Sequence, residues 1–433
     1  MQTHQQSAVK VVHPTVALRA MGTRNWLFSW TDLGGRYIGI VQSLLAAPHQ
    51  PGRLSGGCAA ACREAYLRCY AMACLKMRLL LKPTMFALFI FIAANPHAVA
   101  VELDLVKTSV PVVLDSRLTI QTSTGKGDVP VHISRDWTIR QVDVTRAIIL
   151  VHGWPRRDLD ADEYVSKHAG KAALDTIFIT PQFLIQADVT GHQLPAATLR
   201  WDLDGWKQGY DAQAPAPVSS FDVIDSIIQR LTDRRKFPNL KIIVLAGHSA
   251  GGQFVQRYAV VGHGADALSA ADIHVRYVVA NPATYLYFTD KRMQSDGSFA
   301  VVDAKNCPGF SNWNMGWLGK LPAYVAQPVS VDKLEKAYLA RDVVYLLGTA
   351  DNDPIADALG MSCPYKIQGA TRYDRGLAYA KYIDFSAQGH SNHRLMKVPN
   401  VGHHAYAMYS STCGLAALFD RPGCRLKKWR CTR

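Results

Sequence analysis

The stretch VLAGHSAGGQFVQRYA, residues 244–259, joins two sequence patterns that normally belong to different elements. Its first residues continue the apolar, β-branched run LKIIVLA, which is typical of a buried strand. Its last residues repeat apolar side chains at helical spacing. Ser249 stands between the two patterns, with Gly247 and Gly251 two positions away on either side. This order predicts a tight turn that joins a strand directly to a helix and exposes the serine.

The same alternation of strand and helix runs through the chain from about residue 104. Helical periods occur in SFDVIDSIIQRLTDRR and GGQFVQRYAVVG, between several of the apolar runs. Near-continuous apolar strands alternating with amphipathic helices predict an α/β fold, with a mostly parallel central sheet and helices on both faces. The expected strands are SVPVVLDS, LTIQTST, VPVHIS, RAIILVHGW, TIFITPQF, LKIIVLAGHS, HVRYVVANP, DVVYLLGTAD and HRLMKVPNVGHH.

Polar residues follow the predicted parallel strands, at the sheet edge where open α/β sheets bind ligands. His152, Gly153 and Trp154 follow the first of these strands, and Ser249 follows a later one. An acid, Asp351, and two adjacent histidines after Gly402 follow the last two runs. A serine, an acid and a histidine thus occupy strand ends in that chain order, and a Gly-x-Ser-x-Gly turn between strand and helix is typical of a nucleophile elbow.

With these motifs, the sequence resembles the α/β-hydrolase superfamily of serine hydrolases over roughly residues 105–420. The blocks GHSAGGQFVQRYA, NPATYLYF, CPGFSNWNMG and ATRYDRGLAYA are further similar to a largely uncharacterised subgroup of secreted hydrolases. That closer likeness does not identify a substrate, because a fold hosts many functions.

The resemblance implies a catalytic triad in which Ser249 is the nucleophile, His403 the general base and Asp351 the acid that orients the base. It also implies an oxyanion hole made by the backbone N–H groups of Trp154 and Ala250. A serine hydroxyl is a poor nucleophile at neutral pH, so an imidazole must accept its proton and a carboxylate must hold the ring. Glycine at the two flanking elbow positions, Gly247 and Gly251, avoids collisions with the neighbouring strand and helix.

Two of these assignments have close competitors in the sequence. Asp353 competes with Asp351, although Asp353 precedes a proline and is typical of a turn. His404 competes with His403, and the position directly after the glycine favours His403. His248, inside the elbow, is expected to be a packed neighbour.

We expect neither a metal ion nor a cofactor. His390, His393 and the pair at 403–404 could suggest zinc, but no acidic or sulfur partner lies at ligand spacing.

Residues 283–340 form a long insertion between two predicted strands, and in this fold such segments often make a lid over the nucleophile. Taken singly, the aromatic residues of the insertion are typical of a core. As a group they predict an aromatic lid that suits an organic ester, with residues 200–218 as a second wall. The aromatic residues are Tyr285, Tyr287, Trp313, Trp317 and Tyr324.

The function that these residues favour is a secreted serine hydrolase that cleaves carboxylic esters through an acyl-enzyme intermediate. One alternative is an amidase or peptide-polymer hydrolase with the same triad. A third, from another class, is a non-catalytic binding protein on a hydrolase scaffold; the intact triad argues against it. The expected partner is a small-molecule or polymeric ester or amide substrate, and the sequence does not predict an oligomeric state.

The formal net charge of +14 is unevenly distributed along the chain. Residues 1–100 contain ten Lys or Arg and two Asp or Glu, which leaves 38 basic against 32 acidic residues in the remainder. So dilute an excess excludes a phosphate-binding face, and we expect no nucleic-acid partner.

The stretch from Met77 to Ala100 has the three parts of a secretory signal peptide. Two basic residues precede an apolar core of ten residues, and Ala98-Val99-Ala100 is a small-x-small cleavage pattern. The core is too short for a stable membrane anchor, which needs about 20 apolar residues. We therefore expect a secreted or periplasmic protein that begins at Val101, with residues 101–433 as the hydrolase domain. Residues 1–76 are then an upstream extension that is disordered or not part of the native protein.

Five cysteines remain after the predicted cleavage site, and secretion would allow them to form disulfides. Four cysteines already permit three connectivities, so sequence leaves the pairing open. We predict Cys307–Cys363 and Cys413–Cys424, with Cys431 left over.

Overall fold

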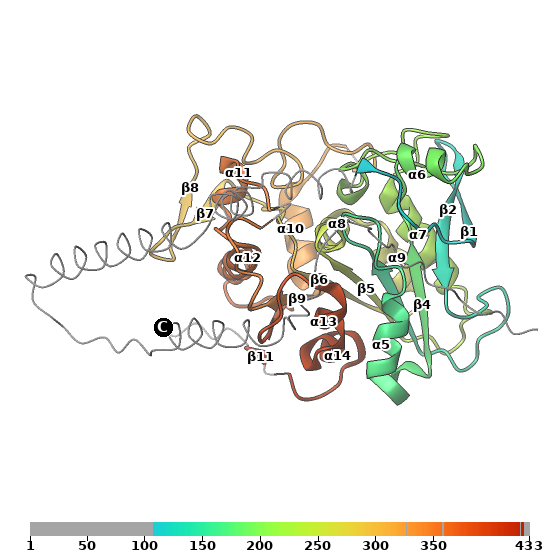
Figure 1. Cartoon of the computed structure of the whole chain (residues 1–433). Helices are drawn as coiled ribbons and strands as arrows, with labels where there is room; N and C mark the ends of the chain where they lie inside the picture. Colours follow the sequence, from blue (N-terminus) through green and yellow to red (C-terminus); the bar gives the residue numbers. More distant parts are fainter. Residues whose placement is uncertain (1–106, 326, 357–358, 425, 428–433) are drawn as a thin grey trace, which may run out of the picture. The chain divides into compact units, whose positions relative to one another are not determined.

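The structure of the protein, a computed structural model, describes residues 107–427 except 326, 357–358 and 425 (Figure 1). These residues belong to one compact unit, Asn95–Arg433. The predicted upstream extension (1–76), signal peptide (77–100) and mature start at Val101 lie outside the described residues, and so does Cys431.

The described residues form a nine-stranded sheet in the order β1-β2-β4-β3-β5-β6-β9-β10-β11. Six neighbouring strands, from β4 to β10, run parallel, while β1, β2 and β11 pair antiparallel at the edges. The prediction of a mostly parallel sheet is confirmed. The strands are β1 (Arg117–Gln121), β2 (Lys126–Ile133), β3 (Arg146–Val151), β4 (Thr176–Pro181), β5 (Ile242–His248), β6 (His274–Ala280), β9 (Asp342–Gly348), β10 (Arg394–Val398) and β11 (Leu426–Lys427).

One predicted strand is wrong. SVPVVLDS, residues 109–116, forms no strand. Its backbone N–H groups bond to side chains instead of a neighbouring strand: Val110 N donates to Asp188 Oδ1 at 2.8 Å, and Leu114 N donates to Gln182 Oε1 at 3.0 Å. The apolar side chain of Val110 packs in a small separate cluster with Leu184. An apolar alternation does not reveal that side chains will take the place of a strand partner.

Helices cover both faces of the sheet, as predicted (Figure 1). Helices α7, α8 and α12 pack on one face, and α5, α13 and α14 pack on the other. The helices are α5 (Ala161–Ala169), α6 (Gln186–Gly191), α7 (Ser220–Leu231), α8 (Ala250–Val261), α9 (Gly264–Ala270), α10 (Val331–Ala340), α11 (Cys363–Lys366), α12 (Arg372–Ser386), α13 (Ala405–Ser410) and α14 (Thr412–Phe419), with 3-10 turns η1 (Gly170–Ala173) and η2 (Trp206–Gln208).

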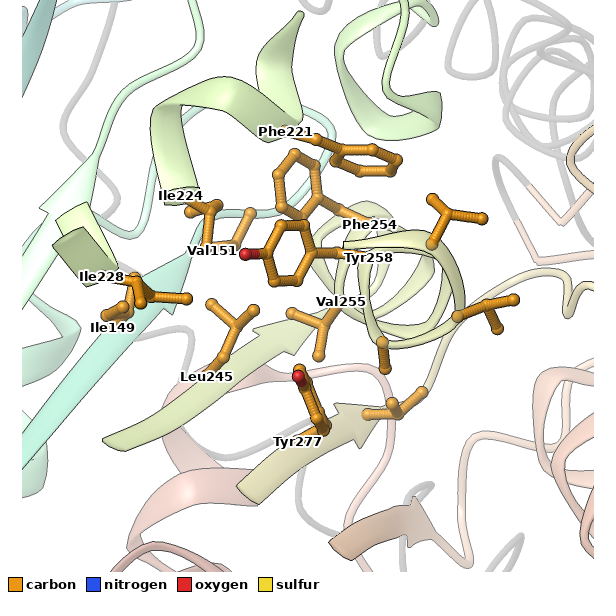
Figure 2. Packing of buried hydrophobic residues seen from close by; sticks show 14 of the residues in the cluster. Ile149, Val151, Phe221, Ile224, Ile228, Leu245, Phe254, Val255, Tyr258 and Tyr277 are labelled. Carbon is orange, nitrogen blue, oxygen red and sulfur yellow. The ribbon is translucent and has the colours of Figure 1, made fainter. Parts of the chain in front are cut away.

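Alternate residues of the central strands supply the two halves of the core. In β3, Ile149 and Val151 face α7 and α8, whereas Ile148 and Leu150 face α5 and α14. Successive strand side chains point to opposite faces, so a strand covered on both sides must be apolar throughout. Figure 2 shows the first half-core, in which side chains from α7 and α8 converge on those of β3, β5 and β6.

Both predicted disulfides are present in the structure. Cys307 pairs with Cys363, with their Cα atoms 5.5 Å apart, and Cys413 pairs with Cys424, with their Cα atoms 4.7 Å apart. The first links the 283–340 insertion to the start of α11.

The insertion contains a small hairpin, β7 (Lys291–Met293) with β8 (Phe299–Val301), followed by irregular chain and α10. Its aromatic residues Tyr285, Tyr287, Trp313 and Tyr324 are buried in the main core, and Trp317 packs against that core. These aromatic residues are therefore core residues, as the sequence predicts when each is taken singly.

Candidate active site

Ser249 occupies the turn between β5 and α8, where the chain reverses direction without an intervening loop. Its φ of 58° and ψ of −118° lie in a region that residues with a side chain rarely adopt. The turn is held by the Ser249 N–H, which donates to Ala280 O at 2.9 Å on the neighbouring strand. The serine side chain therefore stands away from the backbone at the carboxyl end of the sheet.

Glycine is required on both sides of this turn because other backbone atoms approach so closely. A Cβ atom on Gly247 would lie 2.1 Å from Gly251 O, and a Cβ atom on Gly251 would lie 2.2 Å from Val151 O. Backbone oxygens at such distances cannot move aside without displacing a strand or a helix. The predicted steric reason for these two glycines is confirmed.

Ser249, His403 and Asp351 form one chain of hydrogen bonds. His403 Nδ1 lies 2.7 Å from Asp351 Oδ2, and His403 Nε2 lies 2.9 Å from Ser249 Oγ. A carboxylate only accepts, so Nδ1 carries the proton and, in the neutral ring, Nε2 accepts from the serine hydroxyl. Asp351 is 4% exposed and the His403 side chain is 29% exposed, so the carboxylate is shielded while the ring is open to a substrate.

The three residues follow three parallel strands of the sheet. Ser249 follows β5, Asp351 lies after β9 and His403 lies after β10. The sheet places a nucleophile elbow after its central strand, and the three residues follow in the chain order Ser, Asp, His. Both features are typical of α/β hydrolases. The described domain has the α/β-hydrolase fold.

Comparisons with solved structures find similar chains at low sequence identity. The poly(3-hydroxybutyrate) depolymerase LpqC from Bordetella parapertussis is 18% identical, with a TM-score of 0.46, over 71% of this chain and 91% of its own. Poly(aspartic acid) hydrolase-1 from Sphingomonas sp. KT-1 is 21% identical, with a TM-score of 0.44, over 68% of this chain and 96% of its own. No protein-family model matches the sequence, and no curated protein matches it.

The competing acid and base lie outside the hydrogen-bonded chain of this α/β-hydrolase domain. Asp353 is exposed, and its Oδ1 accepts from the Ile355 N–H in a local turn. His404 is the N-cap of α13, where its Nδ1 accepts from the Ala407 N–H at 3.4 Å. Asp353 thus bonds to the backbone of its own turn, and His404 bonds to the backbone of the helix that it caps.

His248 packs against the ring of His403, with the ring centroids 4.5 Å apart. Burial, and then the neighbouring His403, holds the pKa of His248 well below its ordinary value. His248 is therefore a packed neighbour of the candidate base, as predicted, and its ring is neutral.

The two proposed oxyanion donors are the backbone N–H groups of Trp154, after β3, and of Ala250, at the start of α8. Both residues line the same cavity as Ser249. The first turn of a helix presents unpaired N–H groups and positive dipole charge, which favours negative charge there.

His152 holds the loop that carries Trp154. Its Nδ1 donates to Gly153 O at 2.8 Å, and its Nε2 accepts from the Phe183 N–H at 2.9 Å. Burial lowers the pKa of His152 to about 4, so the ring is neutral at pH 7 and both bonds persist. The sequence places His152 at a strand end but carries no signal for this role.

The cavity at Ser249 has a volume of about 210 Å³. Residues 200–218 supply three of its lining residues, which confirms that this segment forms a wall. The insertion supplies Ala283, Thr284 and Asn314, whereas its five aromatic residues do not line the cavity, so the expected aromatic lid is wrong. Those side chains are needed to fill the core. The full lining is Trp154, Asp204, Lys207, Gln208, Ser249, Ala250, Gln253, Ala283, Thr284, Asn314, Gly360 and Tyr365.

Sequence reasoning missed the polar character of this lining. Gln253 had a signal: it follows Ser249 by four residues, which places both on one face of the helix. Lys207 lies in the segment 200–218 that was expected to form a wall, but nothing in the sequence singled out its charge, and Tyr365 had no signal. Within the described residues, no group of three or more His, Cys, Asp or Glu side chains is arranged to hold a metal ion.

Proposed function

We propose that the protein is a serine hydrolase that cleaves carboxylic esters through an acyl-enzyme intermediate. The observation that carries the proposal is the hydrogen-bonded chain from Ser249 Oγ through His403 to the buried Asp351. In the proposed mechanism, His403 Nε2 accepts the serine proton as Oγ attacks the ester carbonyl carbon, and the ring later protonates the leaving alcohol. Water then attacks the acyl-enzyme with the same assistance.

Asp351 has two tasks in this mechanism. Its carboxylate accepts from Nδ1, which fixes the ring in the tautomer whose Nε2 can accept a proton, and it stabilises the imidazolium that forms. The N–H groups of Trp154 and Ala250 would donate to the oxyanion of the tetrahedral intermediate. Donors of this kind contribute a factor of roughly 10²–10³ each in hydrolases where they have been removed.

The decisive experiment is covalent labelling of the purified protein by a fluorophosphonate probe, together with hydrolysis of p-nitrophenyl esters of increasing chain length and of matched amides. Wild-type protein is expected to be labelled and to cleave esters faster than amides. Ser249→Ala is expected to abolish both labelling and turnover with an unchanged circular dichroism spectrum, because only a hydroxyl is lost. Undiminished labelling of Ser249→Ala would assign the chemistry to another residue, and faster amide cleavage would favour the amidase alternative.

We also propose that the protein is exported and that the mature chain begins at Val101. Two disulfides support this, because disulfides persist mainly in oxidising compartments. In the described part of the chain, none of the helices has the length and apolar character needed to cross a bilayer. Mass spectrometry of the exported protein tests the cleavage site, and a product that retains residues 85–100 would contradict it.

A further inference from the structure

A buried arginine that has no carboxylate partner in the described part of the chain lies behind the wall of the Ser249 cavity. Arg257 is 0% exposed, and its guanidinium donates to neutral oxygens: Thr284 Oγ1 at 2.9 Å, Asn314 O at 2.7 Å and, at longer range, Gln253 Oε1. Its Nε has no hydrogen-bond partner among the described residues. A buried charge normally has a counter-ion, because desolvation costs several kcal/mol.

Arg257 and Thr284 fix the orientation of the Gln253 amide. Arg257 Nη2 lies 3.4 Å from Gln253 Oε1, and the Thr284 hydroxyl donates to the same oxygen at 3.0 Å. Because the oxygen of the amide is held against the wall, its NH₂ group is the free end. This group has no hydrogen-bond partner among the described residues, and Gln253 lines the cavity one helical turn after Ser249.

Lys207 adds a second positive charge to the same cavity. Its side chain is 15% exposed, its ammonium group bonds to Asp204, and it lies 5.1 Å from the centre of the Trp154 ring. Asp204 is 52% exposed and is the one hydrogen-bond acceptor that the described residues give this ammonium group, which has three donors. Burial, opposed by Asp204, lowers the pKa of Lys207, and the nearby Arg257 lowers it further. Positive charge in this wall is therefore incompletely compensated.

We propose that Gln253 and Lys207, backed by Arg257, form a subsite for a carboxylate on the acyl part of the substrate, so that the enzyme prefers monoesters of short dicarboxylic acids. This inference rests on the proposed ester hydrolysis at Ser249. A carboxylate accepts hydrogen bonds only, and this wall offers ammonium and amide donors. One helical turn spans about 5.4 Å, which suits a four-carbon diacid whose far carboxylate meets Gln253 while the near carbonyl meets Ser249. The cavity is smaller than the roughly 300–1,000 Å³ of sites for drug-sized ligands, in keeping with a short acyl group.

Three methyl esters of similar size test the subsite: monomethyl succinate, methyl levulinate as a neutral isostere, and methyl 4-methylpentanoate as an apolar one. Methanol release gives kcat/KM for each ester. Wild-type enzyme is expected to favour monomethyl succinate over methyl levulinate at least tenfold. Lys207→Met and Gln253→Glu are each expected to lower this ratio at least tenfold, while Lys241→Met, an exposed lysine before β5 at the opposite sheet edge, leaves it unchanged.

The rate on methyl levulinate and the fluorophosphonate labelling of each variant report whether its fold and catalytic chain are intact. Calorimetric binding of monomethyl succinate and methyl levulinate to Ser249→Ala measures the preference without turnover. Equal or weaker binding of the carboxylate, or an unchanged ratio in both variants, would overturn the subsite even if Ser249 is the nucleophile. Preferential binding of the carboxylate by Ser249→Ala, together with a wild-type protein that the probe does not label, would instead retain the subsite and overturn the hydrolase.

Discussion

The Nε2 atom of His403 lies 2.9 Å from Oγ of Ser249, although 154 positions separate the two residues in sequence. Their strands are not neighbours either, because β6 and β9 run between β5 and β10. The contact exists because parallel strands end at the same edge of the sheet and the loop after β10 turns back over that edge. A change of loop conformation by one residue would replace His403 with His404.

The two adjacent histidines are expected to differ sharply in their effect on catalysis. His403→Ala removes the proton acceptor and is expected to lower kcat by about 10³-fold or more. His404→Ala removes a cap of α13 and is expected to change kcat less than about fivefold, since its ring bonds to the Ala407 N–H. Steady-state kinetics on one ester would check both variants. A larger loss in His404→Ala would move the base by one residue.

The candidate acid is tested by the pair Asp351→Asn and Asp353→Asn. An amide at 351 can donate to His403 Nδ1 and thereby favour the wrong ring tautomer, so kcat is expected to fall about 10³–10⁴-fold. Asp353→Asn keeps an acceptor for the local turn and is expected to retain near wild-type activity. Comparable losses in the two variants would contradict the assignment of Asp351.

The close approach at the elbow predicts a large stability difference between two glycine substitutions. Gly251→Ala would place Cβ 2.2 Å from Val151 O, so the free energy of unfolding is expected to fall by at least about 3 kcal/mol. Gly297→Ala, with φ +85° in open space, is expected to cost about 1 kcal/mol. Urea unfolding with the disulfides intact measures both. A Gly251→Ala protein as stable as Gly297→Ala would show that the elbow can relax.

Neutral buried histidines predict a loss of stability in mild acid. Burial lowers the pKa of His393 to about 4, as it does for His152. Below pH 6.5 the unfolded chain binds protons that the folded protein does not, so stability falls as pH decreases from about 6.5 to about 4. Each histidine contributes about 1.4 kcal/mol per pH unit over this interval.

His393→Gln isolates this contribution, because glutamine can keep hydrogen bonds to Tyr345 and Tyr338 without titrating. The variant is expected to be less stable than wild type at pH 7 and to lose less stability between pH 6.5 and pH 4. Urea unfolding across this interval measures the difference. Parallel curves for the two proteins would contradict a neutral His393.

Local patterns predicted most of the fold because the buried face of each strand or helix determines which of its positions are apolar. β3 is apolar at every position from Ala147 to Val151, as a strand covered on both faces requires. The SVPVVLDS segment has a similar pattern but forms no strand, since the Asp188 and Gln182 side chains bond to its N–H groups. Its partners lie about 70 to 80 positions away, beyond the reach of any local pattern.

The sequence by itself determined the parallel sheet, the elbow around Ser249 and the strand ends on which the acid and the histidine lie. These features follow from steric and burial constraints that act within a few residues. Only the tertiary structure decided that His403 rather than His404 meets Ser249, and that the cavity wall is built from Lys207 and Gln253 rather than from the aromatic residues of the insertion. The physical reason is that a side chain's own element sets which way it can point, whereas the packing of distant loops sets what it meets there.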